Sequence, residues 1–187
     1  MLGCVTVNVV LRPAADHPEL LAAPTAKALA EHADALPLAR IEVGAIDPAL
    51  ADTAAFCAEY GVALHESANC VVVAAKRAGQ TAFAACLVLA TTRADINGLV
   101  RRHLGARKIS FAPMDEAVAR TGMEYGGITP VGLPAHWPVL IDEAVAAAPR
   151  VVVGSGIRGS KLWLPGGALT LLPNAEVLPG LGMPVAR

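Results

Sequence analysis

Two long apolar runs separated by a short polar segment constrain the fold of this chain more than any other feature of its sequence. The first run, residues 69–75, is rich in β-branched valine, and the second spans residues 81–91. The segment 76–80 between them carries three polar side chains and one glycine. Apolar runs that flank a short glycine-containing loop are typical of a β-hairpin. We therefore predict two long paired strands at the centre of the fold.

Shorter elements are expected on both sides of this hairpin. Apolar spacing and capping residues predict helices over residues 24–35, 47–60, 95–104, 113–121, 143–148 and 167–172. Alternating or short apolar patterns predict strands over residues 39–43, 108–111, 139–142, 151–153 and 161–164. Hairpins and glycine-rich loops interrupt any regular β-α-β alternation, which favours a mixed α/β (α+β) fold. We predict a central, strongly curved, mixed β-sheet that curls toward a barrel and is flanked by helices.

Length and composition point to one soluble domain. The chain has 187 residues, 55% of them hydrophobic, so a substantial core can form. No apolar run reaches the roughly 18 residues that a membrane-spanning helix needs. The apolar N-terminus lacks a preceding basic segment and resembles a strand more than a signal peptide. The net charge of −1 gives no global attraction to nucleic acid, so we expect no binding to DNA. Because neither a spanning helix nor a signal peptide is predicted, we expect a cytoplasmic protein that does not bind membranes.

The cysteines and histidines do not form a metal-site pattern. The four cysteines include no C-x-x-C pair, and the five histidines show no H-x-x-x-H spacing. Cys70 and Cys86 lie inside the apolar runs, where buried and unreactive thiols are expected. We predict no metal ion.

A G-x-G-x-x-G pattern at residues 154–159 follows a predicted strand. A dinucleotide site requires that such glycines open a helix, with an acidic residue about 20 positions further on. Pro165 and Gly166 prevent a long helix here, and too little chain follows for a complete β-α-β unit. We therefore predict no dinucleotide at this segment.

Two further features each allow two interpretations. Gly126 and Gly127 would let the backbone approach a ligand or present N–H groups to an oxyanion, but paired glycines also serve in tight connections. A basic cluster at the end of the helix 95–104 would either contact phosphates or complement the helix dipole. The cluster consists of Arg101, Arg102, His103, Arg107 and Lys108.

Four segments, in matching order and spacing, resemble the YbaK-type editing domains, the family associated with prolyl-tRNA synthetase. The segments are DTAAFCAEYGV (52–62), LGARKISFAP (104–113), TGMEYGGITPVGLP (121–134), and VLIDEAV (139–145) followed by VVVGSGIRG (151–159). The resemblance implies a YbaK-like editing domain over residues 38–187. Residues 1–37 are then expected to be an N-terminal extension, a strand and a helix that pack on the domain.

The family removes wrongly attached amino acids from tRNA without a cofactor, so the resemblance implies an aminoacyl-tRNA deacylase. Its implied partners are the acceptor end of a mischarged tRNA and an aminoacyl-tRNA synthetase. The family's G-x-x-x-P loop corresponds to residues 126–130, and its second glycine-rich turn to residues 155–159. We predict Thr129 and Ser155 as catalytic residues. The predicted substrate-binding residues are Asn69, Gly126, Gly127, Ile128, Pro130, Gly156 and Arg158, and the predicted RNA contacts are Arg101, Arg102, Arg107 and Lys108.

One residue departs from the family pattern. The family carries a lysine early in its central strand, and the resemblance places Val71 at that position. Lys76 lies about 16 Å further along an extended strand and on the opposite face. Two interpretations follow. Either the protein is a deacylase that uses other polar groups and the substrate's neighbouring hydroxyl, or it is a catalytically degenerate domain that binds a small ligand or a partner without turnover.

Overall fold

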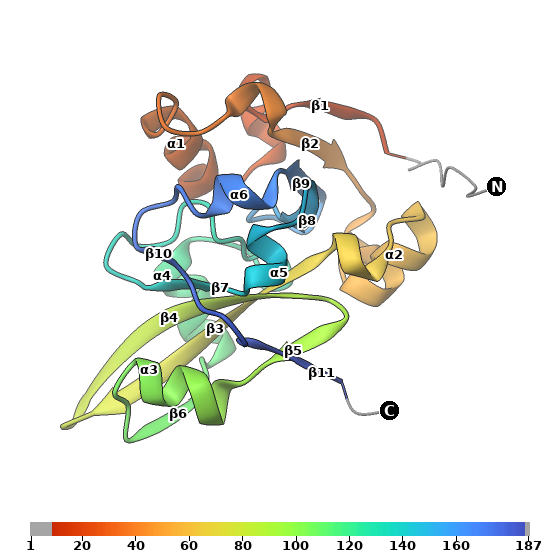
Figure 1. The fold of residues 1–187 in the computed structure, drawn as a ribbon. Helices are drawn as coiled ribbons and strands as arrows, with labels where there is room; N and C mark the ends of the chain where they lie inside the picture. Colours follow the sequence, from red (N-terminus) through yellow and green to blue (C-terminus); the bar gives the residue numbers. More distant parts are fainter. Residues whose placement is uncertain (1–8, 186–187) are drawn as a thin grey trace.

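The strands of the computed structural model, which describes residues 9–185, form three sheets (Figure 1). The strand-like N-terminus expected from the sequence begins in residues 1–8, which lie outside the described residues. The five-stranded sheet contains, in spatial order, β10 (Ala175–Val177), β7 (Val139–Ile141), β4 (Gln80–Leu89), β3 (Ala68–Arg77) and β6 (Lys108–Phe111). The four-stranded sheet contains β1 (Leu11–Pro13), β2 (Glu42–Ala45), β9 (Ser160–Leu164) and β8 (Val151–Gly154). The third sheet pairs β5 (Thr92–Ala94) with β11 (Gly182–Pro184).

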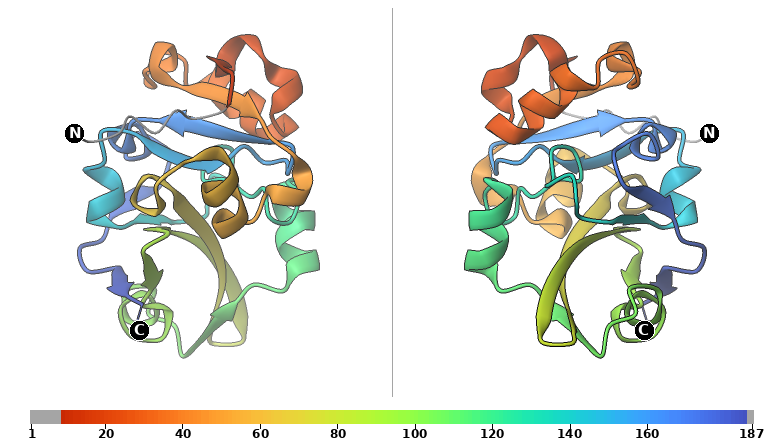
Figure 2. Two further views of the ribbon diagram at one scale, coloured as in Figure 1. Left: turned by 90° about the vertical axis from the view of Figure 1, so that its right-hand side faces the viewer. Right: turned by 90° about the vertical axis from the view of Figure 1, so that its left-hand side faces the viewer.

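The predicted hairpin is the centre of the larger sheet. β3 and β4 pair antiparallel over their whole length, and Figure 2 shows them strongly bent. Their two-residue turn places both Ala78 and Gly79 at positive φ, 49° and 81°, as the tight turns that match strand twist require. β7 lies parallel to β4, and β6 lies antiparallel to β3, so the sheet is mixed as predicted. The three sheets stay open within residues 9–185, and no barrel closes there.

Helices and single helical turns cover these sheets. The α-helices are α1 (Ala23–Glu31), α2 (Thr53–Tyr60), α3 (Arg101–His103), α4 (Met114–Thr121), α5 (Glu143–Ala146) and α6 (Gly166–Leu169). The 3-10 turns are η1 (Ala14–Asp16), η2 (Pro18–Leu20), η3 (Leu38–Arg40), η4 (Pro48–Leu50) and η5 (Leu64–Glu66), and the π-helical turn is η6 (Ile96–Val100). No helix among the described residues is long and apolar enough to cross a membrane.

The predicted helix over residues 47–60 is two elements rather than one. Asp47 accepts a hydrogen bond from the Ala49 N–H and caps η4, and Asp52 accepts one from the Ala54 N–H and caps α2. Gly61, with a φ of 67°, ends α2 as expected. The break between the two elements leaves Ala51 as a corner of the chain beside the four-stranded sheet. The Ala51 carbonyl accepts a hydrogen bond from the side chain of Lys161 on β9.

The main core lies between the two larger sheets and includes the N-terminal segment. Leu21, Leu29 and Leu36 belong to the same buried cluster as Leu87 of β4 and Leu162 of β9. In Figure 1 this segment, drawn in red and orange, covers the side of the molecule formed by β8 and β9. The described part of residues 1–37 therefore shares the core of the rest of the chain.

Candidate functional site

A cavity of about 490 Å³ opens beside the first half of β3. Its walls come from β3, β8 and β9, from the start of α2, from the end of β6 with α4, and from the glycine-rich loop after α4. Ligand sites of 300–1,000 Å³ are common in proteins, so its size suits a small organic group. The walls are formed by segments that lie far apart in the sequence.

The cavity lies where an edge of β3 is left uncovered. β6 pairs with β3 only from Val73 onward, and β8 is joined by a single bridge, at Val152, to Ser67, the residue before β3. The Ala112 N–H donates to the Val72 carbonyl, so the even-numbered residues of β3 turn their peptide groups toward this edge. The peptide group of Cys70 therefore faces the gap between β6 and β8, where it offers one donor and one acceptor.

The two glycine-rich segments pack directly against each other behind the cavity. The Gly156 N–H donates to the Gly127 carbonyl at 2.8 Å, and the Glu124 N–H donates to the Gly156 carbonyl at 2.8 Å. A Cβ at Gly127 would lie 2.5 Å from the backbone carbon of Ile157, so only glycine allows this approach. Gly126 and Ile128 line the cavity from one segment, while Arg158 lines it from the other.

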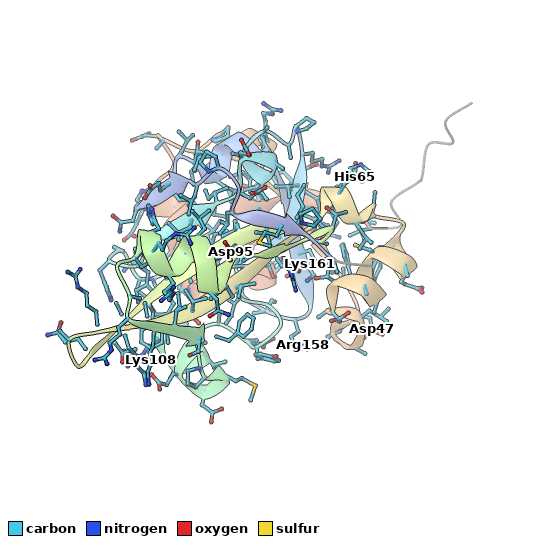
Figure 3. All side chains as sticks on the ribbon, turned by 60° about the horizontal axis from the view of Figure 1, so that its bottom comes forward. Asp47, His65, Asp95, Lys108, Arg158 and Lys161 are labelled. Atoms are coloured by element: carbon cyan, nitrogen blue, oxygen red, sulfur yellow. The ribbon has the colours of Figure 1, made fainter. Side chains whose placement is uncertain are left out.

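Lys161 brings an ammonium group into the cavity wall. Its side chain is 8% exposed, and its Nζ donates to the Ala51 carbonyl at 2.9 Å, in the corner between η4 and α2. The same Nζ lies 5.5 Å from the centre of the Phe56 ring. Its neighbours on β2 and β8 are Gly44 and Gly154, so no side chain crowds it from either paired strand. Figure 3 shows Lys161 close to Arg158 on the same side of the molecule.

The charge of Lys161 has no carboxylate partner within ion-pair distance among the described residues. Burial lowers the pKa of this ammonium below its ordinary value; Cys57 and Asp52 oppose the shift, and Arg158 adds to it. An ammonium has three donors, and one of them is used by Ala51. A buried cation with spare donors suits a ligand that carries negative charge or a polarised carbonyl.

Two hydrogen-bonded polar side chains join the start of α2 to β3. The Thr53 hydroxyl donates to the Asn69 side-chain oxygen at 2.7 Å, and both residues line the cavity. Asp52, which caps α2, also lines it. Asn69 was predicted from the sequence as a substrate-binding residue, and the structure places it in this wall.

Arg158, also a predicted substrate-binding residue, joins three loops around the cavity. Its backbone N–H donates to the Glu124 carboxylate at 2.7 Å. Its guanidinium donates to the Tyr125 carbonyl at 3.3 Å and to the Pro48 carbonyl at 2.9 Å. These bonds hold the guanidinium in place, and its charge adds to the positive potential of the wall.

The structure places Thr129 and Ser155, the predicted catalytic residues, behind the wall rather than in it. Thr129 is fully buried, and its hydroxyl has no hydrogen-bond partner among residues 9–185. The Ser155 hydroxyl bonds with the Ser160 hydroxyl at 2.7 Å and donates to the Ser160 carbonyl at 3.0 Å, which fixes the turn. Gly127, Pro130 and Gly156 also lie outside the lining. The catalytic assignment of Thr129 and Ser155 remains a sequence-based prediction.

Val71 lines the cavity, whereas Lys76 lies exposed near the far end of β3.

Cys70 also lines the cavity, but burial raises the pKa of its thiol, as burial raises that of Cys86 to about 12. Neither thiol is therefore a ready nucleophile at neutral pH.

The predicted RNA contacts lie on another part of the surface. Their side chains are exposed on α3, on β6 and on the segment between them, and Figure 3 shows Lys108 well away from Arg158 and Lys161 in that view. Arg101 donates from its Nε to the Asn97 carbonyl, and His103 lies 3.0 Å from the Glu176 carboxylate. Arg101, Arg102, Arg107 and Lys108 are not part of the cavity lining.

Sequence reasoning missed Lys161, Asp52 and Thr53. The signal for Lys161 was available, because a charged residue begins the otherwise apolar strand predicted over residues 161–164. Charged side chains are seldom fully buried unless they have a partner or a function.

Comparisons with known proteins agree with the fold. One structure, described as a candidate trans-editing enzyme for prolyl-tRNA synthetase, matches with a TM-score of 0.69 and 19% identity over 85% of this chain and 97% of that chain. The hypothetical protein APE2540 matches with a TM-score of 0.61 and 23% identity over 70% of this chain and 83% of that chain. A candidate signal transduction protein from Marinobacter aquaeolei VT8 matches with a TM-score of 0.51 and 16% identity over 83% of this chain and 30% of that chain.

These structural likenesses show a shared fold. At the level of sequence, the aminoacyl-tRNA editing domain family matches residues 47–171, which include both glycine-rich segments and Lys161. The chain belongs to the aminoacyl-tRNA editing domain family.

Proposed function

We propose that this protein is an aminoacyl-tRNA deacylase that acts in trans on mischarged tRNA. It hydrolyses the ester between the amino acid and the 3′-terminal ribose. Membership of the editing family supports the reaction class. The observation that carries the proposal is the buried ammonium of Lys161, which has no carboxylate partner among the described residues and lies in a cavity bounded by the open edge of β3 and the glycine-rich loop.

In this reaction a water oxygen attacks the acyl carbonyl carbon and the carbonyl oxygen gains negative charge. The bond from the acyl carbon to the ribose oxygen then breaks, and the ribose oxygen leaves with a proton. Preorganised donors aimed at the developing charge are commonly the largest catalytic contribution. We assign this role to the N–H groups of Lys161 that Ala51 does not use. The ribose hydroxyl beside the ester accepts the proton of the attacking water and passes a proton to the leaving ribose oxygen.

The open edge of β3 and the capping residue of α2 would bind the amino-acid part. The substrate's α-ammonium group needs acceptors, which the Cys70 carbonyl and the Asp52 carboxylate offer. Lys161 thus supplies, from β9, the positive charge that the family's lysine would supply from the position of Val71.

A degenerate domain that binds without turnover is the second candidate. Val71 in place of the lysine, and the position of Thr129 and Ser155 behind the wall, favour it. The two candidates differ in one measurement, which is hydrolysis of mischarged tRNA by the purified protein.

The test is a deacylation panel across mischarged tRNAs with three proteins: the natural chain, Lys161→Met and Val71→Lys. The proposal expects hydrolysis of at least one substrate by the natural chain and its loss in Lys161→Met. Hydrolysis only after Val71→Lys would establish the degenerate alternative. No hydrolysis by the natural chain of any substrate, at stoichiometric protein, would overturn the deacylase proposal.

We also propose that the basic cluster on α3 and β6 contacts the tRNA backbone. The charge-reversal variants Arg102→Glu and Lys108→Glu should weaken tRNA binding and flatten its salt dependence, because a protein that neutralises fewer phosphates displaces fewer counterions from the RNA. Lys27→Glu, an exposed change on α1 that alters the net charge by the same amount and sign, serves as the control for net charge. Unchanged salt dependence in both reversal variants would contradict this contact.

A further inference from the structure

Three large apolar side chains surround the mouth of the cavity and are exposed. Phe111 at the end of β6 is 68% exposed, Tyr125 in the glycine-rich loop is 61% exposed, and Met114 at the start of α4 is 51% exposed. All three line the cavity, and none belongs to a buried cluster. Single exposed apolar residues are ordinary, but three around one opening form a patch with a purpose other than folding.

The backbone beneath the two rings is held in place. Phe111 is paired with Val73 at the end of β6, which fixes its strand position. The Tyr125 carbonyl accepts a hydrogen bond from Arg158, and the flanking Glu124 and Gly127 are bonded to Gly156 and to each other. The rings therefore stand on a fixed frame at the opening, a favourable arrangement for stacking because little backbone entropy is lost on binding.

The charges around the rings indicate what kind of ligand they would take. Asp115 and Glu116 are exposed in the first turn of α4, and Glu124 is exposed beside Tyr125. Stacking does not depend on these carboxylates, because the uncharged face of a nucleobase stacks on an aromatic ring without a counter-charge. The cationic groups, Arg158 and Lys161, lie in the wall of the cavity.

We propose that Phe111 and Tyr125 form a stacking platform for unpaired nucleobases at the 3′ end of the RNA. The inference rests on the proposed function. When the amino acid is held beside Lys161, the base of the terminal nucleotide, whose ribose carries the ester, lies at the mouth of the cavity. Met114 contributes an apolar edge to the platform. The mouth thus recognises the nucleoside, while the interior recognises the amino acid and its ester.

The test measures binding and not hydrolysis. The probe is a short, fluorescently labelled single-stranded RNA with the sequence of the tRNA 3′ terminus, and the matched probe carries an abasic residue at its 3′ end. Phe111→Ala and Tyr125→Ala should each weaken binding of the intact probe about tenfold, since stacking on one aromatic side chain contributes on that order. Phe111→Tyr and Tyr125→Phe should retain binding. Leu64→Ala, at an exposed position outside the cavity lining, should also retain it.

Measuring each protein with both probes shows whether the rings contact the terminal base. The natural protein should bind the abasic probe more weakly, and the alanine variants should bind both probes alike. Equal binding of the intact probe by the natural protein and the double alanine variant would overturn the platform. Equal losses on both probes would instead indicate a general apolar surface, such as a protein-docking face, and would also overturn it. Because the probe carries no amino acid and the measurement is binding, a failure of hydrolysis and a failure of stacking give different results.

Discussion

At the scale of single residues, Lys161 is a buried cation whose place in the fold protein stability alone does not explain. Desolvation of its ammonium is offset by one hydrogen bond and the Phe56 ring, with no carboxylate in contact among the described residues. Replacing a buried charge by an apolar side chain of similar volume is often neutral or stabilising. A residue that costs stability and lies in a cavity wall is best explained by what it binds.

Lys161→Met should therefore separate activity from stability. We expect a free energy of unfolding within about 1 kcal/mol of the natural protein, or higher, since the lost hydrogen bond and the relieved desolvation oppose each other. Deacylation should fall about 10²- to 10³-fold, as on removal of an oxyanion donor. Lys76→Met, the exposed lysine of β3, is the matched control and should leave both quantities unchanged. A parallel loss of stability and activity in Lys161→Met would assign this lysine a structural role.

The lowered pKa of Lys161 predicts opposite pH trends for activity and stability. Between this lowered pKa and the ordinary lysine value, the unfolded chain binds more protons than the folded one, so stability rises with pH in that window. Activity that depends on the ammonium falls as pH rises through the folded-state pKa. Deacylation rates, with spontaneous hydrolysis subtracted, and denaturant unfolding across alkaline pH measure the two trends. Lys161→Met should show neither of these contributions.

At the scale of elements, the sequence was most informative where one segment determines its own structure. The hairpin was predicted because its apolar runs are long, and the observed strands, residues 68–77 and 80–89, differ from the prediction by only a few positions. The three-residue strands β5, β10 and β11 were missed because each depends on a distant pairing partner. The break at Asp52 was missed because the apolar pattern continues through it.

The residues of the site also divide into those that the local sequence reveals and those that only the fold brings together. The two glycine-rich segments are visible in the sequence, and the structure packs them together. Lys161 and its acceptor Ala51 are separated by 110 positions, so only the folded sheet reveals their contact.

The packing of the two glycine-rich segments predicts the effect of an added methyl group. Gly127→Ala should lower the free energy of unfolding by about 1–3 kcal/mol, because its Cβ meets the backbone of Ile157 and the segments must separate. Activity should fall as well, since Gly126 and Arg158 form adjacent parts of the wall. Gly167→Ala is the matched control: its Cβ would meet no atom closer than 4.0 Å, and alanine favours the helix α6. Denaturant unfolding that finds the two variants equally stable would contradict this packing argument.

At the scale of the whole molecule, the N-terminal segment supports the site from behind. The Ser160 hydroxyl donates to the Leu20 carbonyl, and the Ala22 N–H donates to the Ser155 carbonyl at 3.1 Å. The turn that carries Arg158 is thus bonded to a segment outside the region that matches the editing family. We propose that residues 38–187, predicted as the domain, need residues 1–37 to hold this turn.

Deleting residues 1–37 tests this dependence. Leu21, Leu29 and Leu36 are buried in the main core, and their removal exposes the apolar sides of β8 and β9 to water. We expect the truncated chain to lose cooperative thermal unfolding and to aggregate. Because insolubility alone is ambiguous, Leu29→Ala in the full chain supplies a milder change, expected to cost about 2–5 kcal/mol. A truncated chain that melts cooperatively at the natural temperature, together with a Leu29→Ala variant of undiminished stability, would show that residues 38–187 fold alone. The turn carrying Arg158 would then be held by the editing domain itself.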